Sequence, residues 1–199
     1  MMTSETTKLP PGVDLTIVGG GIIGLSLAYE AATVGRSVVV VERHLCGSGA
    51  TPVAAGMLAP VSEAEPTLPE LLEFGLDSCR LYPDFVARAE ADSAMKCGYR
   101  TEGTLSIAVD RDQMEQLEHR AAAHEELGLK AERLSARDVL QLEPGLNARI
   151  VGGLRTEIDC QVDPRALSAA LVAAARARGV VFANATELAS VELGPSGAV

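Results

Sequence analysis

A glycine-rich turn between two apolar runs constrains the fold of this chain more than any other feature. The run at 14–18 leads into GGGIIG at 19–24, and a second run, SVVVVE, covers 37–42. Residues 22–34 are apolar all round with many small side chains, which is typical of a helix buried on a sheet, and Gly35 suits its end. The run at 14–18 is expected to form a short buried strand. A β-branched run as dense as the second one is typical of a buried parallel strand. The segment therefore predicts a βαβ unit.

Three glycines of this turn, Gly19, Gly21 and Gly24, have the spacing G-x-G-x-x-G. Between a strand and a helix, the first allows a tight turn, the second lets backbone approach a pyrophosphate, and the third lets helix and strand pack closely. Backbone N–H groups at the helix N-terminus would then point at the phosphates. Glu42 ends the second strand, where a carboxylate can accept hydrogen bonds from ribose hydroxyls and repels a 2′-phosphate. The pattern predicts an adenine dinucleotide site and leaves FAD and NAD both open.

Helices and strands are expected to alternate along the rest of the chain. The stretch from Cys46 to Pro66 is rich in small residues without a clear period, and a loop of this length is usually functional. A helix is expected over 69–90, and Pro83 is expected to kink or divide it. Further helices are expected over 111–127, 135–142 and 164–178, and strands over 103–109, over 151–156, from Val180 onward, and over 187–193 before the turn signal GPSG.

Two of these helices have clear start signals. Ser135 and Asp138 fit a capping box. Asp163 is a favourable N-cap residue, Pro164 suits the first helical position, and Gly179 suits the C-terminal end. These signals fix the expected helix bounds independently of periodicity.

Charge and composition exclude several classes of function. The net charge is −10, from 17 basic and 27 acidic residues, which argues against a nucleic-acid partner and against an anionic membrane surface. We find no apolar run of about 18 residues, the length that suggests a membrane helix. Residues 1–13 lack the apolar core of a secretion signal and are expected to form a flexible leader. We therefore expect a cytoplasmic protein without membrane or nucleic-acid partners.

The histidines and cysteines do not have the spacing of a metal site. His119 and His124 are five residues apart on an expected helix, which does not put two ligands on one face, and His44 follows the second strand in a polar turn. We expect all three histidines at the surface and no bound metal. The four cysteines are widely spaced without a C-x-x-C pair, so reduced, mostly buried thiols are expected.

The chain resembles a known family over nearly its whole length, from about Asp14 onward. The glycine turn, the pair Glu42–Arg43 and above all AAGMLAP at 54–60 are similar to the glycine oxidases of thiamine biosynthesis. These enzymes belong to the D-amino-acid-oxidase-like family of FAD enzymes. TEGTLSIAVD, LEPGL and CQVDPRALSAAL follow in the order and spacing of that family. The resemblance implies an α/β fold, with a Rossmann-like FAD-binding βαβ part and part of an interleaved α+β substrate domain.

The resemblance also implies a set of FAD-binding residues. Besides the glycines, these are Ile22 and Ile23 at the pyrophosphate, Glu42 and Arg43 at the adenosine ribose, Ala50 and Thr51 along the pyrophosphate and ribityl chain, Ala55, Gly56 and Met57 beside the isoalloxazine ring, and Leu188 at the adenine. Met57 would also lie near the substrate. No Arg occupies a matching motif for the substrate carboxylate, so the catalytic residues are not identified.

The implied activity is the oxidation of a small amine or amino acid, with glycine as the leading candidate. A hydride would pass from the substrate to the flavin, oxygen would be the second substrate, and hydrogen peroxide and ammonia would be products. The family's polypeptides are nearly twice as long, so we expect an N-terminal portion that is inactive alone, and a possible homo-oligomer at full length. The expected division is 1–13 leader, 14–66 FAD-binding unit and cofactor loop, 67–156 substrate-domain portion, and 157–199 return to the FAD-binding domain.

Other functions remain open from the residues alone. The chain could be a non-catalytic dinucleotide-binding remnant or an NAD-binding module that works with another chain. It could also be another flavoenzyme of the D-amino-acid or sarcosine oxidase type.

Overall fold

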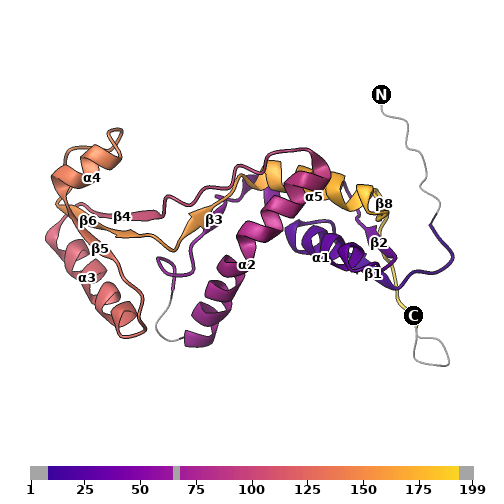
Figure 1. The fold of residues 1–199 in the computed structure, drawn as a ribbon, viewed down its shortest axis with the longest axis horizontal. Coiled ribbons are helices and arrows are strands. Elements are labelled where there is room, and N and C mark those ends of the chain that lie inside the picture. Colours follow the sequence, from indigo (N-terminus) through magenta and orange to yellow (C-terminus); the bar gives the residue numbers. More distant parts are fainter. Residues whose placement is uncertain (1–8, 65–67, 193–199) are drawn as a thin grey trace. The chain divides into compact units, whose positions relative to one another are not determined.

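The structure, a computed structural model, describes residues 9–64 and 68–192 (Figure 1). By their contacts they form two units. Unit 1 comprises Met1–Ala55, Val86–Cys97 and Asp163–Val199, and unit 2 comprises Gly56–Phe85 and Gly98–Val162. The functional division expected from the sequence, with bounds at 66 and 156, stays a prediction.

Unit 1 is built on a parallel three-stranded sheet. Its strands are β1 (Leu15–Val18), β2 (Val38–Val41) and β8 (Val181–Ala183), in the order β1-β2-β8. Val18 pairs with Val41, and Val41 pairs with Ala183, so the carboxyl ends of the strands meet at one edge. In open α/β sheets, ligands bind outside this edge.

Two helices rich in small residues belong to unit 1. α1 (Ile22–Thr33) connects β1 to β2, and α5 (Pro164–Ala177) precedes β8. They pack against each other, and α5 buries Ala170, Ala174 and Ala175. Asp163 caps α5 as expected, because its Oδ1 accepts the N–H groups of Arg165 and Ala166 at 2.9 and 3.2 Å. The predicted βαβ unit and the start of α5 are confirmed.

A buried tyrosine joins three segments of unit 1. Tyr29 of α1 has no exposed surface, and its hydroxyl donates to Asp92 Oδ2 at 2.7 Å. Arg178, directly after α5, donates to the same oxygen at 2.6 Å. The guanidinium groups of Arg178 and Arg88 lie 5.6 and 6.0 Å from the centre of the Tyr29 ring. Residues 86–97 are thereby tied to both helices.

The burial of the first strand differs from the sequence expectation. β1 was expected to be buried, but it lies at the edge of the sheet, and Leu15 and Val18 are 39% and 62% exposed. β2 lies between β1 and β8, and its four valines are all buried. A central strand has a neighbouring strand on each side, whereas an edge strand has a neighbour on one side only and is left open on the other.

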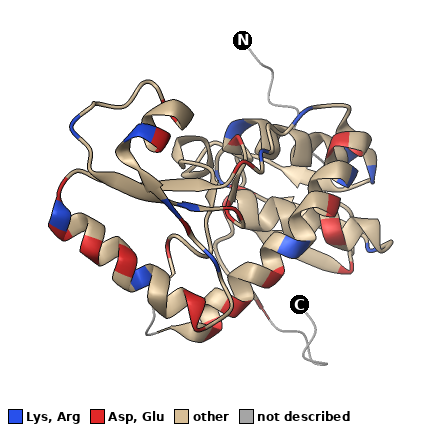
Figure 2. Ribbon diagram, turned by 60° about the vertical axis from the view of Figure 1, so that its left-hand side comes forward, with Lys and Arg blue, Asp and Glu red and all other residues tan. Residues whose placement is uncertain are grey.

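Unit 2 is built on an antiparallel sheet. Its strands are β4 (Thr104–Ala108), β6 (Gly152–Thr156) and β5 (Glu132–Ser135), in the order β4-β6-β5. Its helices include α3 (Arg111–Glu125) and α4 (Ala136–Leu142), and a short ladder pairs β3 (Met57–Leu58) with β7 (Cys160–Gln161). Met114 and Leu117 of α3 pack with Ala108 and Leu154 of the sheet. α3 carries both signs of charge along its length (Figure 2). The capping box of Ser135 and Asp138 is present as predicted.

Several elements differ from those expected. α2 (Pro69–Ser93) continues through Pro83, so of the two expected effects a division is wrong and a kink stays a prediction. The boundary between the two units crosses α2 after Phe85. No strand is found over residues 187–192, where one was expected, while residue 193 and the GPSG turn lie outside the described residues. β3, β5, β7 and a 3-10 turn, η1 (Thr51–Val53), were not anticipated. Within the described residues, the helices are all too short or too polar to span a membrane.

Candidate dinucleotide-binding site

The glycine turn lies at the carboxyl edge of the unit 1 sheet. The Gly19 N–H donates to the Val41 carbonyl at 2.8 Å, and Gly19 has a φ of +104°, which favours glycine. A Cβ on Gly24 would overlap the Gly19 carbonyl oxygen. Gly24 therefore serves the close packing of α1 on the turn, as the motif predicts.

The carboxylate of Glu42 is held against this turn. Its two oxygens accept the backbone N–H groups of Gly20 and His44, each at 2.8 Å. These two N–H groups, Gly20 first, lower the pKa of Glu42, so the group is charged at neutral pH. Each carboxylate oxygen has a second lone pair, which can accept a ribose hydroxyl.

The N-cap residue of α1 is Gly21, which has no side chain to cap the helix. Its backbone is extended, and among the described residues the nearest atom that a Cβ there would meet is Thr51 Oγ1 at 3.9 Å. The Ile22 N–H donates to the buried Thr51 hydroxyl at 3.1 Å. Ile23 follows on the first turn with a side chain that is 75% exposed. The backbone at Gly21 is thus open to a close approach by an anion.

A pocket of about 440 Å³ joins these groups. It is lined by Val18 to Gly21, Val41 to Leu45, Ser48, Gly49 and Thr186 to Leu188. The Ala185 and Thr186 N–H groups donate to the carbonyls of His44 and Glu42 at 2.8 and 3.0 Å, which brings Leu188 alongside. The volume of this pocket is in the range of known cofactor-binding sites.

Five of the expected site residues line this pocket together, namely Gly19, Gly21, Glu42, Arg43 and Leu188. Ile22, Ile23, Gly24, Ala50 and Thr51 belong to the same unit but do not line it. Ala55 closes the first segment of unit 1 and is exposed.

The expected flavin-ring residues Gly56 and Met57 belong to unit 2. The Gly56 carbonyl accepts the Val162 N–H at 2.9 Å, and Met57 pairs with Gln161 and is 51% exposed.

The sequence did not single out several lining residues. Gly20 supplies an N–H to Glu42, and a Cβ there would overlap Cys46 Sγ. His44, Ser48, Gly49, Thr186 and Glu187 also line the pocket. The run of three consecutive glycines was the one sequence signal that pointed to Gly20. The other lining residues come together only because loops distant in sequence meet in the fold.

Cys46 is packed behind the glycine turn. Burial, followed by the charge of Glu42, raises the pKa of its thiol to about 11. A thiol of this kind is protonated and unreactive at neutral pH. Cys46 therefore contributes packing to the site.

These observations fit the adenosine diphosphate part of a dinucleotide. A helix N-terminus that begins at a glycine suits a pyrophosphate, and a charged carboxylate beside it suits a ribose. A match to the family model "DAO: FAD dependent oxidoreductase" covers residues 14–199. The chain belongs to this family of FAD-dependent oxidoreductases. The cofactor of this family is FAD.

Relatives of known name support this assignment. A glycine oxidase from Geobacillus kaustophilus is 30% identical over 94% of this chain and 49% of the relative. The crystal structure of glycine oxidase from Geobacillus kaustophilus matches with a TM-score of 0.86 and 29% identity over 92% of this chain and 50% of that chain. An L-alpha-glycerophosphate oxidase from Mycoplasma pneumoniae with FAD bound matches with a TM-score of 0.77 and 25% identity over 93% of this chain and 48% of that chain. The chain spans about half the length of these relatives.

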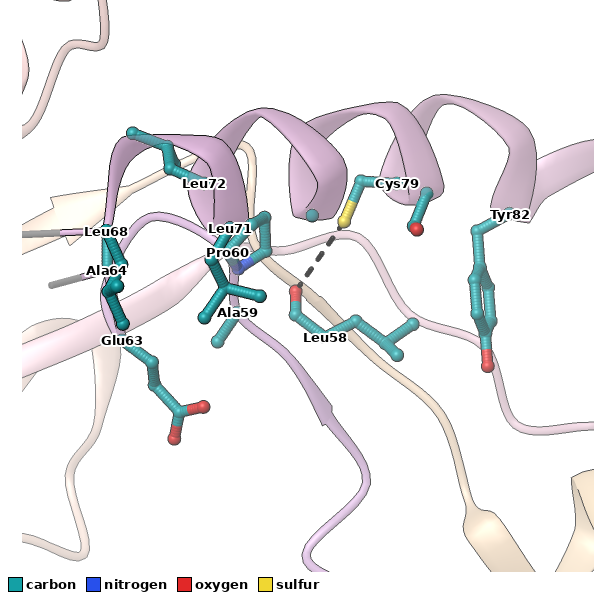
Figure 3. Close-up of a pocket in the computed structure, with 12 residues that line it drawn as sticks. Leu58, Ala59, Pro60, Glu63, Ala64, Leu68, Leu71, Leu72, Cys79 and Tyr82 are labelled. Atoms are coloured by element: carbon teal, nitrogen blue, oxygen red, sulfur yellow. Dashed lines mark hydrogen bonds between the residues drawn. The ribbon is translucent and has the colours of Figure 1, made fainter. Parts of the chain in front are cut away.

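A second pocket, of about 320 Å³, lies within unit 2 (Figure 3). Leu58, Pro60, Leu72, Cys79 and Tyr82 are among its largely apolar lining residues, and Cys79 Sγ lies 4.0 Å from the Leu58 carbonyl oxygen. Burial raises the pKa of the Cys79 thiol. Among the residues that the structure describes, no group of three or more His, Cys, Asp or Glu side chains could hold a metal. We assign no chemistry to this pocket.

Proposed function

We propose that the protein functions as an FAD-dependent oxidase of a small amine or amino acid, with glycine as the leading substrate. Oxygen would be the second substrate, and glyoxylate or the imine, ammonia and hydrogen peroxide the products. Glycine oxidase relatives at about 30% identity support this substrate class. A role in thiamine biosynthesis is part of the same proposal.

The observation that carries the proposal is the pocket at the carboxyl edge of the unit 1 sheet. It brings the glycine turn, the charged Glu42 and Leu188 around one space, although Glu42 and Leu188 are far apart in sequence. In our proposal Glu42 and Arg43 bind the adenosine ribose, and the N-terminus of α1 at Ile22 and Ile23 binds the pyrophosphate. The Leu188 backbone contacts the adenine.

The remaining expected residues would serve the flavin half of the cofactor. Ala50 and Thr51 would lie along the pyrophosphate and ribityl chain, and Ala55, Gly56 and Met57 beside the flavin ring. When bound, the flavin would accept a hydride from the substrate and reduce oxygen to peroxide. Small side chains at these positions leave the backbone accessible, and Met57 offers an adaptable surface to the substrate.

Glycine needs a direct test, because relatives at similar identity differ in their substrates. The L-alpha-glycerophosphate oxidase is 25% identical to this chain, which is close to the values for glycine oxidases. We propose that the 199-residue chain binds the cofactor but oxidises no substrate, because no group for holding a substrate carboxylate is identified in it. A localisation in the cytoplasm and assembly into a homo-oligomer at full length remain proposals.

The test measures binding and turnover separately. Calorimetry with FAD, ADP and NAD on the 199-residue chain should show binding of FAD and ADP. A peroxide-coupled assay with glycine, sarcosine and D-amino acids should give no peroxide with this chain, and should give peroxide with glycine first for any longer product of the gene. Binding of NAD in preference to FAD would overturn the cofactor assignment. Turnover of another amine in preference to glycine would overturn the substrate.

A further inference from the structure

A buried imidazole lies at the end of α3 in unit 2. His124 is 8% exposed, and its Nε2 has no hydrogen-bond partner among the described residues. The expectation that all three histidines lie at the surface is therefore wrong for His124. Leaving a buried polar atom unpaired costs about 1–3 kcal/mol, so such an atom needs an explanation.

His124 lies in the last turn of α3, and residues 124–129, where the helix ends and the chain turns, are called the joint here. Its carbonyl accepts the N–H groups of Leu127 and Leu129 at 2.9 and 3.0 Å, and Gly128 turns the chain with a φ of +77°. Leu129 then packs with Val61 and Leu72 in a separate apolar cluster. The end of α3 is thus fixed by the turn at Gly128 and by the docking of Leu129.

A small cavity lined by polar and apolar side chains lies beside the imidazole. Its volume of about 20 Å³ is near that needed by one water molecule. His124 lines it together with Ser106 of β4, Thr156 of β6 and Ser62, which follows β3. These hydroxyls can satisfy a neutral imidazole through a water, but they supply no negative charge to an imidazolium.

Two charged groups act on this imidazole. Arg120, one turn earlier on α3, lines the same cavity. Asp159, between β6 and β7, is fully buried, and its oxygens accept the Val61 and Ser62 N–H groups at 3.0 Å each, as well as the Ser62 hydroxyl. Burial and then the charge of Arg120 lower the pKa of His124, and the opposing attraction of Asp159 is weaker. The ring is therefore neutral at neutral pH, because burial and the charge of Arg120 both favour its uncharged form.

We propose that the buried imidazole makes the C-terminal end of α3 an acid-sensitive joint, which is closed while the ring is neutral and opens when the ring takes up a proton. Opening would hydrate the charged ring and release Leu129 from Val61 and Leu72. The proposal concerns unit 2 alone and does not depend on the proposed function.

The direction of the pH dependence follows from linkage. The pKa of His124 is lower in the native chain than in the unfolded chain, where it is about 6.5. The closed joint therefore has its full stability above about pH 6.5 and loses it as the pH falls through the native pKa. Between about pH 6.5 and the native pKa of His124, each fall of one pH unit reduces the ratio of closed to open joints by up to about tenfold.

The chain offers a matched control on the same helix. His119 is exposed, whereas His124 is buried, so His119→Gln and His124→Gln remove one titrating ring each. Hydrogen exchange of the amides over 117–134 is measured from pH 7.5 to 5 and corrected for its intrinsic pH dependence. The wild type and His119→Gln should lose protection in this segment as the pH falls, and His124→Gln should not.

Proton NMR of the histidine rings provides a second measurement that needs no variant of His124. The pKa of His124 should be lower in the native chain than in the chain unfolded in urea, and amide protection over 117–134 should fall as the pH decreases from about 6.5 toward that native pKa. The proposal is overturned if His124 titrates in the native chain at or above its pH in the unfolded chain, or if protection over 117–134 does not fall over this pH range. If His124→Gln does not fold, the wild-type titration and exchange decide the question.

Discussion

Two glycines of one motif should respond to the same substitution in opposite ways. A Cβ on Gly24 would overlap the Gly19 carbonyl oxygen, which is backbone and cannot rotate away. Overpacking of this kind costs about 3 kcal/mol, and the better helix propensity of alanine returns about 1 kcal/mol. We therefore expect Gly24→Ala to lower the free energy of unfolding by about 2 kcal/mol.

Gly21→Ala should behave differently. Its Cβ would meet Thr51 Oγ1 at 3.9 Å, an ordinary contact, and the backbone is already in an extended conformation that alanine adopts. Loss of a favourable N-cap residue costs about 0.5–1 kcal/mol. The methyl group would, however, stand where a pyrophosphate approaches the helix in the proposed binding mode, so ADP affinity should fall at least about tenfold, or about 1.4 kcal/mol.

The assay combines urea unfolding with calorimetric titration of ADP and FAD for both variants and the wild type. The free energy of unfolding should fall more in Gly24→Ala than in Gly21→Ala, whereas the affinity for ADP should fall mainly in Gly21→Ala. The reasoning would be refuted if Gly21→Ala bound ADP as tightly as the wild type. It would also be refuted if Gly24→Ala were as stable as Gly21→Ala.

Three further outcomes are expected. Glu42→Ala should weaken ADP binding by about 1.5–3 kcal/mol, because a charged acceptor is lost, and calorimetry with unchanged affinity would contradict a place at the ribose. Asp92→Asn should lower the free energy of unfolding in urea by about 1 kcal/mol, because the carboxylate holds Arg178 in a partly exposed pair, and equal stability would contradict this role. Native Cys46 and Cys97 should react slowly with iodoacetamide at pH 7.5, since burial raises the pKa of each thiol to about 11, and labelling as fast as in urea would contradict their burial.

The sequence predicted those elements whose signals are local. The strand, turn and helix at 14–34 follow from adjacent residues, and so do the capping box at Ser135 and the N-cap at Asp163. Side chains three residues apart suffice to determine such caps. Five of the residues expected at the cofactor also line one pocket of unit 1, and their binding roles stay predictions.

Long-range pairing accounts for most of what the sequence did not predict. β3 and β7 have two residues each, and their pairing joins residues about a hundred positions apart, so no local pattern marks them. The stretch after β8 has alternating apolar residues like a strand, yet its N–H groups at Ala185 and Thr186 bond to the loop after β2. His124 has a polar side chain on a charged helix, and its burial depends on the sheet beneath it.

Four identical residues make β2 unusual in one further respect. A strand usually keeps its alignment because a shift by one residue would move polar side chains into the core. Val38 to Val41 are interchangeable, so their side chains cannot distinguish one alignment from the next.

Polar residues at the two ends of β2 must therefore fix its alignment. At the start, Ser37 donates to Asp14 Oδ2 through its N–H at 2.8 Å and its hydroxyl at 2.7 Å. At the end, Glu42 accepts the Gly20 N–H. The exposed pair of Asp14 and Ser37 thus helps to set the position of Glu42 at the opposite end of β2. If β2 slipped by one residue, the Glu42 carboxylate would move about 3.3 Å away from the Gly20 N–H.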